Sequence, residues 1–191
     1  MRYVIIAVLF GVLAAVSGCG GKDVSNQRGG NAPPSTPSPS TGPKQTSGLP
    51  DNLIVKKAPE GAKDISTALK EAKGGEDVVI RGRVGGMEEV FMKDRATMMM
   101  MDLSMKSCDM IPGDACKTPW DYCCDDEDTK RKNRATIQVV DTNGKILNTT
   151  LQGSVSELDV IVVKGKVVKI DAANFIINAN EIFIEEKFKK G

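Results

Sequence analysis

Four of the five cysteines lie within one short segment, residues 108–124, which reads C-D-M-I-P-G-D-A-C-K-T-P-W-D-Y-C-C. Thiols this close in sequence can form disulfides, hold a metal ion or take part in redox chemistry. The same segment carries the only tryptophan, Trp120, and one of the two tyrosines, Tyr122. This segment is therefore the first candidate for a functional site, and the remaining elements are expected to position it.

Disulfides are the chemistry that this segment favours. An even number of cysteines in an exported chain indicates paired thiols, and the candidates are Cys108, Cys116, Cys123 and Cys124. A direct bond between the adjacent Cys123 and Cys124 needs a strained ring, so each is expected to pair with Cys108 or Cys116. Two such bridges would staple a loop that has little core of its own, each contributing about 2–4 kcal/mol.

A metal site is the alternative for the same four thiols. Zinc sites usually contain C-x-x-C pairs, whereas these cysteines are separated by seven, six and no residues. Copper is a second alternative, because thioethers suit Cu(I) and four methionines are consecutive. Methionine also fills irregular gaps in a protein core, which is the competing interpretation of the run. The run consists of Met98, Met99, Met100 and Met101.

The composition argues against an enzyme. The sequence has no histidine, which removes the commonest general base and the commonest metal ligand. It also has no C-x-x-C motif to activate a thiol. Most zinc enzymes and all hydrolases that use a Ser-His or Cys-His pair are thereby excluded. We expect a non-enzymatic protein without a bound cofactor, unless the thiols and methionines hold zinc or copper.

The first eighteen residues have the features of an export signal. Arg2 precedes an apolar run at residues 4–16, which is too short to span a bilayer comfortably. The residues V-S-G-C at 16–19 resemble the lipobox of bacterial lipoproteins. The resemblance implies cleavage before Cys19 and lipid on its sulfur. The protein is then expected to be exported and lipid-anchored to a bacterial membrane; Gly20, rather than an aspartate, favours the outer one.

Beyond Cys19 the chain changes character twice. Residues 19–50 are rich in proline, serine and glycine and bury too little apolar surface to fold, so they are predicted to form a disordered tether. Residues 51–75 are predicted to be an extension with one short helix, which starts near Asp64 or Ser66 and ends near Lys73. The charged run at residues 125–134 is expected to be a solvated loop.

Two predicted strands repeat one pattern, V-I-R-G-R-V at residues 79–84 and V-V-K-G-K-V at 162–167. Gly82 and Gly165 should face inward, where a strand bends to close a small barrel. With the intervening strands, the order resembles OB-folds, in particular anticodon-binding-type OB domains, over residues 76–185. The resemblance implies an all-β fold with one short helix: a five-stranded OB-like barrel at 76–191 with a cysteine-rich insertion at 104–134. The segment T-P-W-D-Y-C-C is also similar to one in uncharacterised exported planctomycete OB-like proteins.

The same two strands suggest a binding surface. Side chains alternate along a strand, so four basic residues should share one face. These candidate ligand contacts are Arg81, Arg83, Lys164 and Lys166, with Trp120 and Tyr122 from the insertion. The whole chain has 26 Lys+Arg and 25 Asp+Glu; without residues 1–18, which contain only Arg2, the net charge is zero.

The sequence therefore predicts a membrane-anchored, non-enzymatic binding or interaction module of the cell envelope. Its partner is expected to be an envelope protein, a glycan or a small anion. Metal or redox handling by the cysteines and methionines is the alternative. Single-stranded nucleic acid, the ligand of many OB domains, is the least expected partner, because aromatic residues are few, the chain is neutral and the compartment does not favour it.

Overall fold

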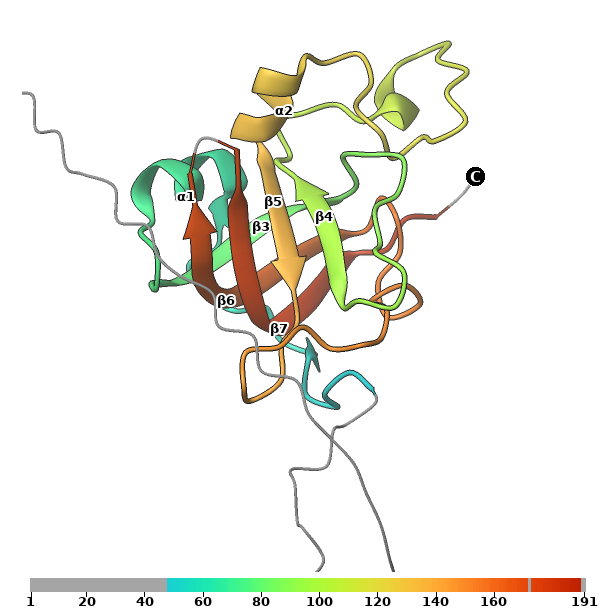
Figure 1. Ribbon diagram of the computed structural model, residues 1–191. Coiled ribbons are helices and arrows are strands. Elements are labelled where there is room, and N and C mark those ends of the chain that lie inside the picture. Colours follow the sequence, from blue (N-terminus) through green and yellow to red (C-terminus); the bar gives the residue numbers. More distant parts are fainter. Residues whose placement is uncertain (1–47, 172, 190–191) are drawn as a thin grey trace, which may run out of the picture. The chain divides into compact units, whose positions relative to one another are not determined.

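A closed β-barrel forms the centre of the protein. The computed structural model describes residues 48–171 and 173–189 (Figure 1). The five strands of the barrel are β3 (Asp77–Val84), β4 (Thr97–Met101), β5 (Arg134–Gln138), β6 (Val160–Ile170) and β7 (Phe175–Glu186). Antiparallel pairs join β3 to β4 and β6, β4 to β5, and β6 to β7, and the parallel pair of β5 with β7 closes the barrel. The predicted all-β, OB-like barrel is confirmed.

The predicted signal peptide, the lipidation site Cys19 and the tether up to residue 47 lie outside the described residues. Within residues 48–171 and 173–189, no helix is both long enough and apolar enough to cross a membrane.

Short elements decorate the barrel. Strand β1 (Ile54–Val55) pairs with β7, and β2 (Lys63–Asp64) pairs with β3, both in parallel. Helix α1 (Ile65–Glu71) follows β2 directly, and its buried residues Ile65 and Ala68 join the barrel core. It begins where the sequence predicts and ends before Lys73, because the backbone of Ala72 is already extended.

The insertion between β4 and β5 contains two helical segments, the 3-10 helix η1 (Cys108–Met110) and α2 (Glu127–Lys132). Helix α2 corrects the expectation of a loop over the charged run. The Asp126 carboxylate caps the helix by accepting a hydrogen bond of 2.9 Å from the Thr129 backbone N–H. Salt bridges three residues apart, such as Lys130 to Glu127 at 2.5 Å, add support along the helix.

The two central glycines lie in the barrel wall where strands approach most closely. Both are buried, as predicted. A Cβ atom at Gly165 would lie 2.3 Å from the carbonyl oxygen of Asn178 on β7, and one at Gly82 would lie 2.6 Å from that of Met101 on β4. The register of β6 against β7 also shifts between Lys164 and Gly165. Glycine at these positions therefore permits the curvature that closes the barrel.

The methionine run supplies packing on both faces of β4. Met98 and Met100 are fully buried in the barrel core. Met101 is also buried, and its Sδ would lie 2.7 Å from a Cβ atom at Gly86. Met99 is half-buried on the other face, where its Sδ accepts a hydrogen bond of 3.3 Å from the Thr136 hydroxyl. The core-filling interpretation of the run thus accounts for Met98 and Met100.

Candidate functional site

The cysteine-rich insertion is fastened to the barrel at its base. Asp102 follows β4 and is 1% exposed; its carboxylate accepts hydrogen bonds of 2.8 Å from Ser66 N–H and 2.9 Å from Ser104 N–H. Burial raises the pKa of Asp102, but these backbone hydrogen bonds outweigh it and hold the pKa below its ordinary value. The Asp102 N–H in turn donates to the carbonyl of Asn133 at 2.8 Å, so the two ends of the insertion are joined.

Trp120 holds the insertion against the turn that follows β3. The indole Nε1 of Trp120 donates to the carbonyl of Glu88 at 3.1 Å, and the Trp120 carbonyl accepts from Gly86 N–H at 3.0 Å. A Cβ atom at Gly85 would lie 2.5 Å from that same Trp120 oxygen, so the close approach requires glycine. The sequence marks the Gly85-Gly86 pair as a turn but does not show what packs on it.

Tyr122 is a core residue of the insertion rather than a ligand contact. It is only 1% exposed, which corrects its assignment to a binding surface. Its hydroxyl makes no hydrogen bond of ordinary geometry with the described residues; burial raises the pKa of the phenol to about 12, although the nearby Ser107 side chain lowers it. Tyr122 is therefore a buried side chain directly before Cys123 and Cys124.

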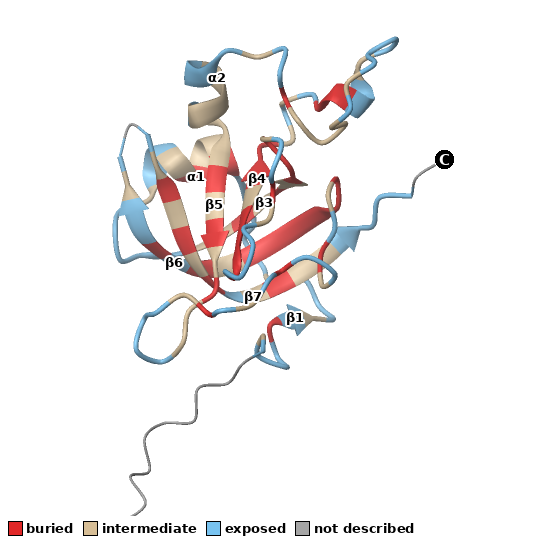
Figure 2. Ribbon diagram, turned by 45° about the vertical axis from the view of Figure 1, so that its right-hand side comes forward, coloured by how far each residue is buried: buried red, intermediate tan, exposed pale blue. Residues whose placement is uncertain are grey.

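The backbone of the insertion doubles back so that Cys108 and Cys123 come together. The N–H of Cys108 donates to the carbonyl of Asp121 at 2.9 Å, and the N–H of Asp109 donates to that of Pro119 at 3.0 Å. At the tip, the Cys116 N–H donates to a carboxylate oxygen of Asp114 at 2.9 Å. Figure 2 shows the insertion beyond the barrel wall, with a buried residue in η1 and mostly exposed or half-buried residues around it.

This folding gathers three thiols. The Sγ atoms of Cys108, Cys116 and Cys123 all lie within 4.8 Å of one another, and those of Cys108 and Cys123 are 3.4 Å apart. A second group shares Cys123, because its Sγ, that of Cys124 and a carboxylate oxygen of Asp114 also lie within 4.8 Å of one another. The sequence analysis does not name Asp114 as a site residue. Its position two residues before Cys116 is the only sequence feature that points to it.

The predicted disulfides are not seen. All four cysteines are free, and the shortest sulfur–sulfur contact, 3.4 Å, exceeds the bond length of about 2.05 Å. The four sulfurs do not form two separate pairs, because three of them, from Cys108, Cys116 and Cys123, lie within 4.8 Å of one another. Cys108 is buried, Cys116 is half-buried, and Cys123 and Cys124 are exposed, so the group opens to solvent on one side.

The three clustered thiols differ in their surroundings. The Sγ of Cys116 lies 3.4 Å from the Thr118 hydroxyl and 3.5 Å from the Thr118 carbonyl oxygen. Hydrogen bonding with the Thr118 side chain lowers the pKa of Cys116, whereas burial raises the pKa of Cys108. Of the three clustered thiols, Cys116 is thus the one whose pKa is lowered.

The predicted basic face is largely neutralised by acidic partners. Arg81 Nε lies 2.5 Å from Glu185, Lys164 Nζ 2.7 Å from Glu181, and Lys166 Nζ 3.4 Å from Asp77. Arg83 alone of the four has no carboxylate partner within the described part of the chain, and its Nη1 donates to Met110 Sδ at 3.3 Å. Three of its four positive charges are therefore paired, and only Arg83 is left without a carboxylate among the described residues, which disfavours this surface as a site for a polyanion such as a nucleic acid.

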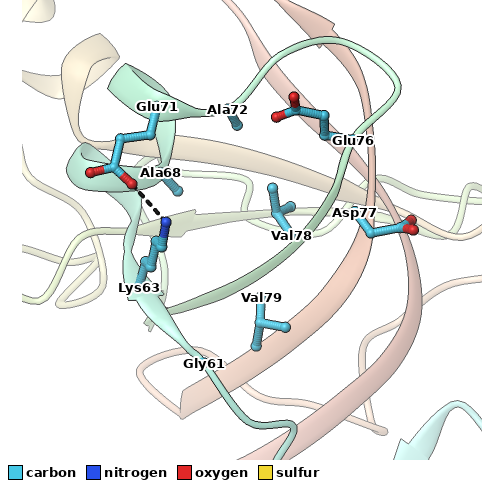
Figure 3. Close-up of a pocket in the computed structure, with 9 residues that line it drawn as sticks. All are labelled: Gly61, Lys63, Ala68, Glu71, Ala72, Glu76, Asp77, Val78 and Val79. Carbon is cyan, nitrogen blue, oxygen red and sulfur yellow. Dashed lines mark hydrogen bonds and ion pairs between the residues drawn. The ribbon is translucent and has the colours of Figure 1, made fainter.

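A cavity of about 260 Å³ lies between α1, β2 and β3 (Figure 3). Its polar side chains already have partners: Lys63 Nζ pairs with Glu71 at 2.6 Å, and the Glu76 carboxylate accepts from Lys73 N–H at 2.9 Å. Asp77 is engaged by Lys166. These polar side chains of the cavity are all paired, so none of them is free to bind a ligand. The insertion therefore remains the candidate site.

Comparisons with known proteins assign this chain to no family. No family model and no curated protein matches its sequence. Among solved structures, it is similar to a Leishmania major Friedlin protein provisionally described as an aspartyl-tRNA synthetase, with 9% identity and a TM-score of 0.38, over 77% of this chain and 23% of that one. It is also similar to the aspartyl tRNA synthetase of Entamoeba histolytica, with 11% identity and a TM-score of 0.42, over 78% of this chain and 28% of that one. The chain thus spans about a quarter of the length of either protein, and at these scores the similarity supports no argument about function.

Proposed function

We propose that this protein is a lipid-anchored, non-enzymatic binding module of the bacterial cell envelope, in which the barrel is the scaffold and the insertion at residues 104–134 holds the ligand. The observation that carries the proposal is the grouping of Cys108, Cys116 and Cys123 within 4.8 Å on a loop fastened to the barrel. Fixed donor groups that open to solvent are what a binding site needs, because little ordering entropy is then lost when a ligand binds.

The sequence supports a location at the membrane surface. An apolar leader followed by V-S-G-C at residues 16–19 supports export and lipid attachment at Cys19. Several acyl chains on one residue give a stable anchor, whereas a single chain binds a membrane only marginally. The proline-rich residues up to about 50 then allow the module to reach away from the membrane surface.

The other candidate surfaces are less well supported. Ion pairs engage Arg81, Lys164 and Lys166, and Tyr122 is buried. A nucleic acid bound on this face would have to break these pairs and would meet few aromatic rings on which to stack. An envelope protein or a glycan remains compatible with the exposed tip of the insertion, and the test below applies to either.

Protection of the thiols in isolated envelopes tests the proposal. Envelopes that contain the full chain are treated with reductant and then with a maleimide, and alkylation of Cys116, Cys123 and Cys124 is followed by mass spectrometry. The same measurement is made on purified protein dialysed against a chelator. We expect slower alkylation in the envelopes, because a ligand covers the thiols. A cysteine introduced on the barrel by Lys145→Cys should react equally in both samples. Equal alkylation of the native thiols would refute the proposal.

A further inference from the structure

The chemistry of the grouped sulfurs identifies a class of ligand. Resting on the function proposed above, we infer that Cys108, Cys116 and Cys123 form a three-thiolate site for a thiophilic divalent metal ion such as Zn²⁺. The three Sγ atoms lie within 4.8 Å of one another. Ligand sulfurs around tetrahedral zinc are about 3.8 Å apart, given Zn–S bonds of about 2.3 Å. The side chains therefore need only small rotations to enclose an ion.

A metal centre explains the arrangement better than disulfides do. A bridge between Cys108 and Cys123 would use two of the three converging sulfurs and would leave the Cys116 thiol against the bond. The remaining candidate partner, Cys124, groups instead with Asp114 and Cys123. One ion satisfies all three sulfurs at once, whereas two bridges would require the four sulfurs to separate into two pairs.

The surroundings of the three sulfurs also suit an ion. Cys108 is buried and supplies a ligand on the closed side, and Cys123 and Cys116 complete the group toward solvent, from which an ion can enter. The Thr118 hydroxyl, 3.4 Å from Cys116 Sγ, can donate to a thiolate and orient it. The Asp114 carboxylate lies within 4.8 Å of Cys123 Sγ and is a candidate oxygen ligand for a fourth position.

Binding of the metal ion releases protons from the thiols. Three neutral thiols and one M²⁺ ion give a complex with a single negative charge, and three protons are released to solvent. No bond is oxidised or reduced. Sulfurs held in this way are not free to attack a disulfide, so occupancy of the site preserves the thiols in an oxidising compartment.

Cobalt is the probe that tests this site. The full chain is purified from membranes in detergent, reduced, stripped with a chelator and titrated with Co²⁺, whose thiolate charge-transfer absorption reports sulfur ligands directly; competition with Zn²⁺ gives the affinity. We expect one ion per chain and the release of protons on binding. Each of Cys108→Ser, Cys116→Ser and Cys123→Ser should weaken binding by more than about 100-fold, beyond the 10–100-fold typical of outer-shell partners. Cys124→Ser is the matched control and should keep the charge-transfer band.

Two results would overturn the inference. One is a reduced, folded chain, checked by circular dichroism, that gives no charge-transfer band with Co²⁺. The other is binding that survives Cys108→Ser, Cys116→Ser or Cys123→Ser. Failure here is distinguishable from failure of the proposed function: thiols that stay protected in envelopes but bind no metal indicate a different ligand, whereas thiols that are neither protected nor metal-binding refute both.

Discussion

Replacing Gly165 with alanine should destabilise the protein more than any other glycine-to-alanine change in the barrel wall. The new methyl group would lie 2.3 Å from the Asn178 carbonyl oxygen and 2.9 Å from the Ala179 Cα atom. Both are backbone atoms, so strand β7 must move away by about 1 Å to restore ordinary contact. Overpacking of this kind costs about 1–3 kcal/mol, and each weakened ladder hydrogen bond adds about 1 kcal/mol. The lower entropy of the unfolded alanine chain returns about 0.4–1 kcal/mol, which leaves a net loss of about 1–4 kcal/mol when one such bond is weakened.

Urea unfolding of the purified, reduced chain, followed by circular dichroism, measures this loss. Gly82→Ala should cost less, because two of its three close neighbours are the flexible ends of the Ile65 and Met100 side chains. Gly74→Ala is the matched control: no atom lies within 4 Å of its Cβ position, so its stability should be unchanged or slightly higher. If Gly165→Ala unfolds at the same urea concentration as the wild type, these glycines do not set the curvature of the barrel.

Four further changes test other parts of the argument. Tyr122→Phe should leave the free energy of unfolding unchanged or raise it by about 1 kcal/mol, because the buried hydroxyl lacks a partner among the described residues; a loss of 1 kcal/mol or more in urea unfolding would reveal a hydrogen bond. Asp102→Asn should destabilise the protein at pH 7. Because folding lowers the Asp102 pKa, its stabilisation is present above the unfolded pKa of about 3.9 and is lost as pH falls through the folded value, so stability curves of the two proteins should converge in acid and would stay parallel if the carboxylate were irrelevant. Asp114→Asn should weaken Co²⁺ binding by about 10-fold if the carboxylate is a ligand or orients one, and an unchanged affinity would assign the fourth position to another group. Cys19→Ser should abolish labelling by radioactive palmitate and move the protein from the membrane to the soluble fraction; persistent labelling would exclude the lipobox.

The barrel could be predicted because its signals are local. Strands β3 and β5 alternate in burial along the chain, and the two glycine-centred strands show which face is inner. The neutralised basic face could not be predicted, because it depends on strand register. Glu181 and Glu185 come from β7, and they meet Lys164 and Arg81 only after β6 has paired with β7 on one side and with β3 on the other.

The candidate site shows the same limit. Its residue types are plain in the sequence, and the four cysteines were named from it. Their convergence depends on backbone hydrogen bonds such as that from Cys108 to Asp121, for which the spacing of the cysteines gives no sign. The sequence names Tyr122 as a candidate ligand contact because it lies in the insertion, but its side chain is buried there.

The insertion leaves and re-enters the barrel at adjoining points, since Met101 pairs with Arg134 and Asp102 bonds to Asn133. The two ends are therefore already fixed side by side, whatever lies between them. Doubling the length of a flexible connection costs only about 0.6 kcal/mol of closure entropy. We therefore expect the barrel to tolerate exchange of this whole segment, so that loops of other composition can be grafted between Asp102 and Asn133 without redesign of the strands.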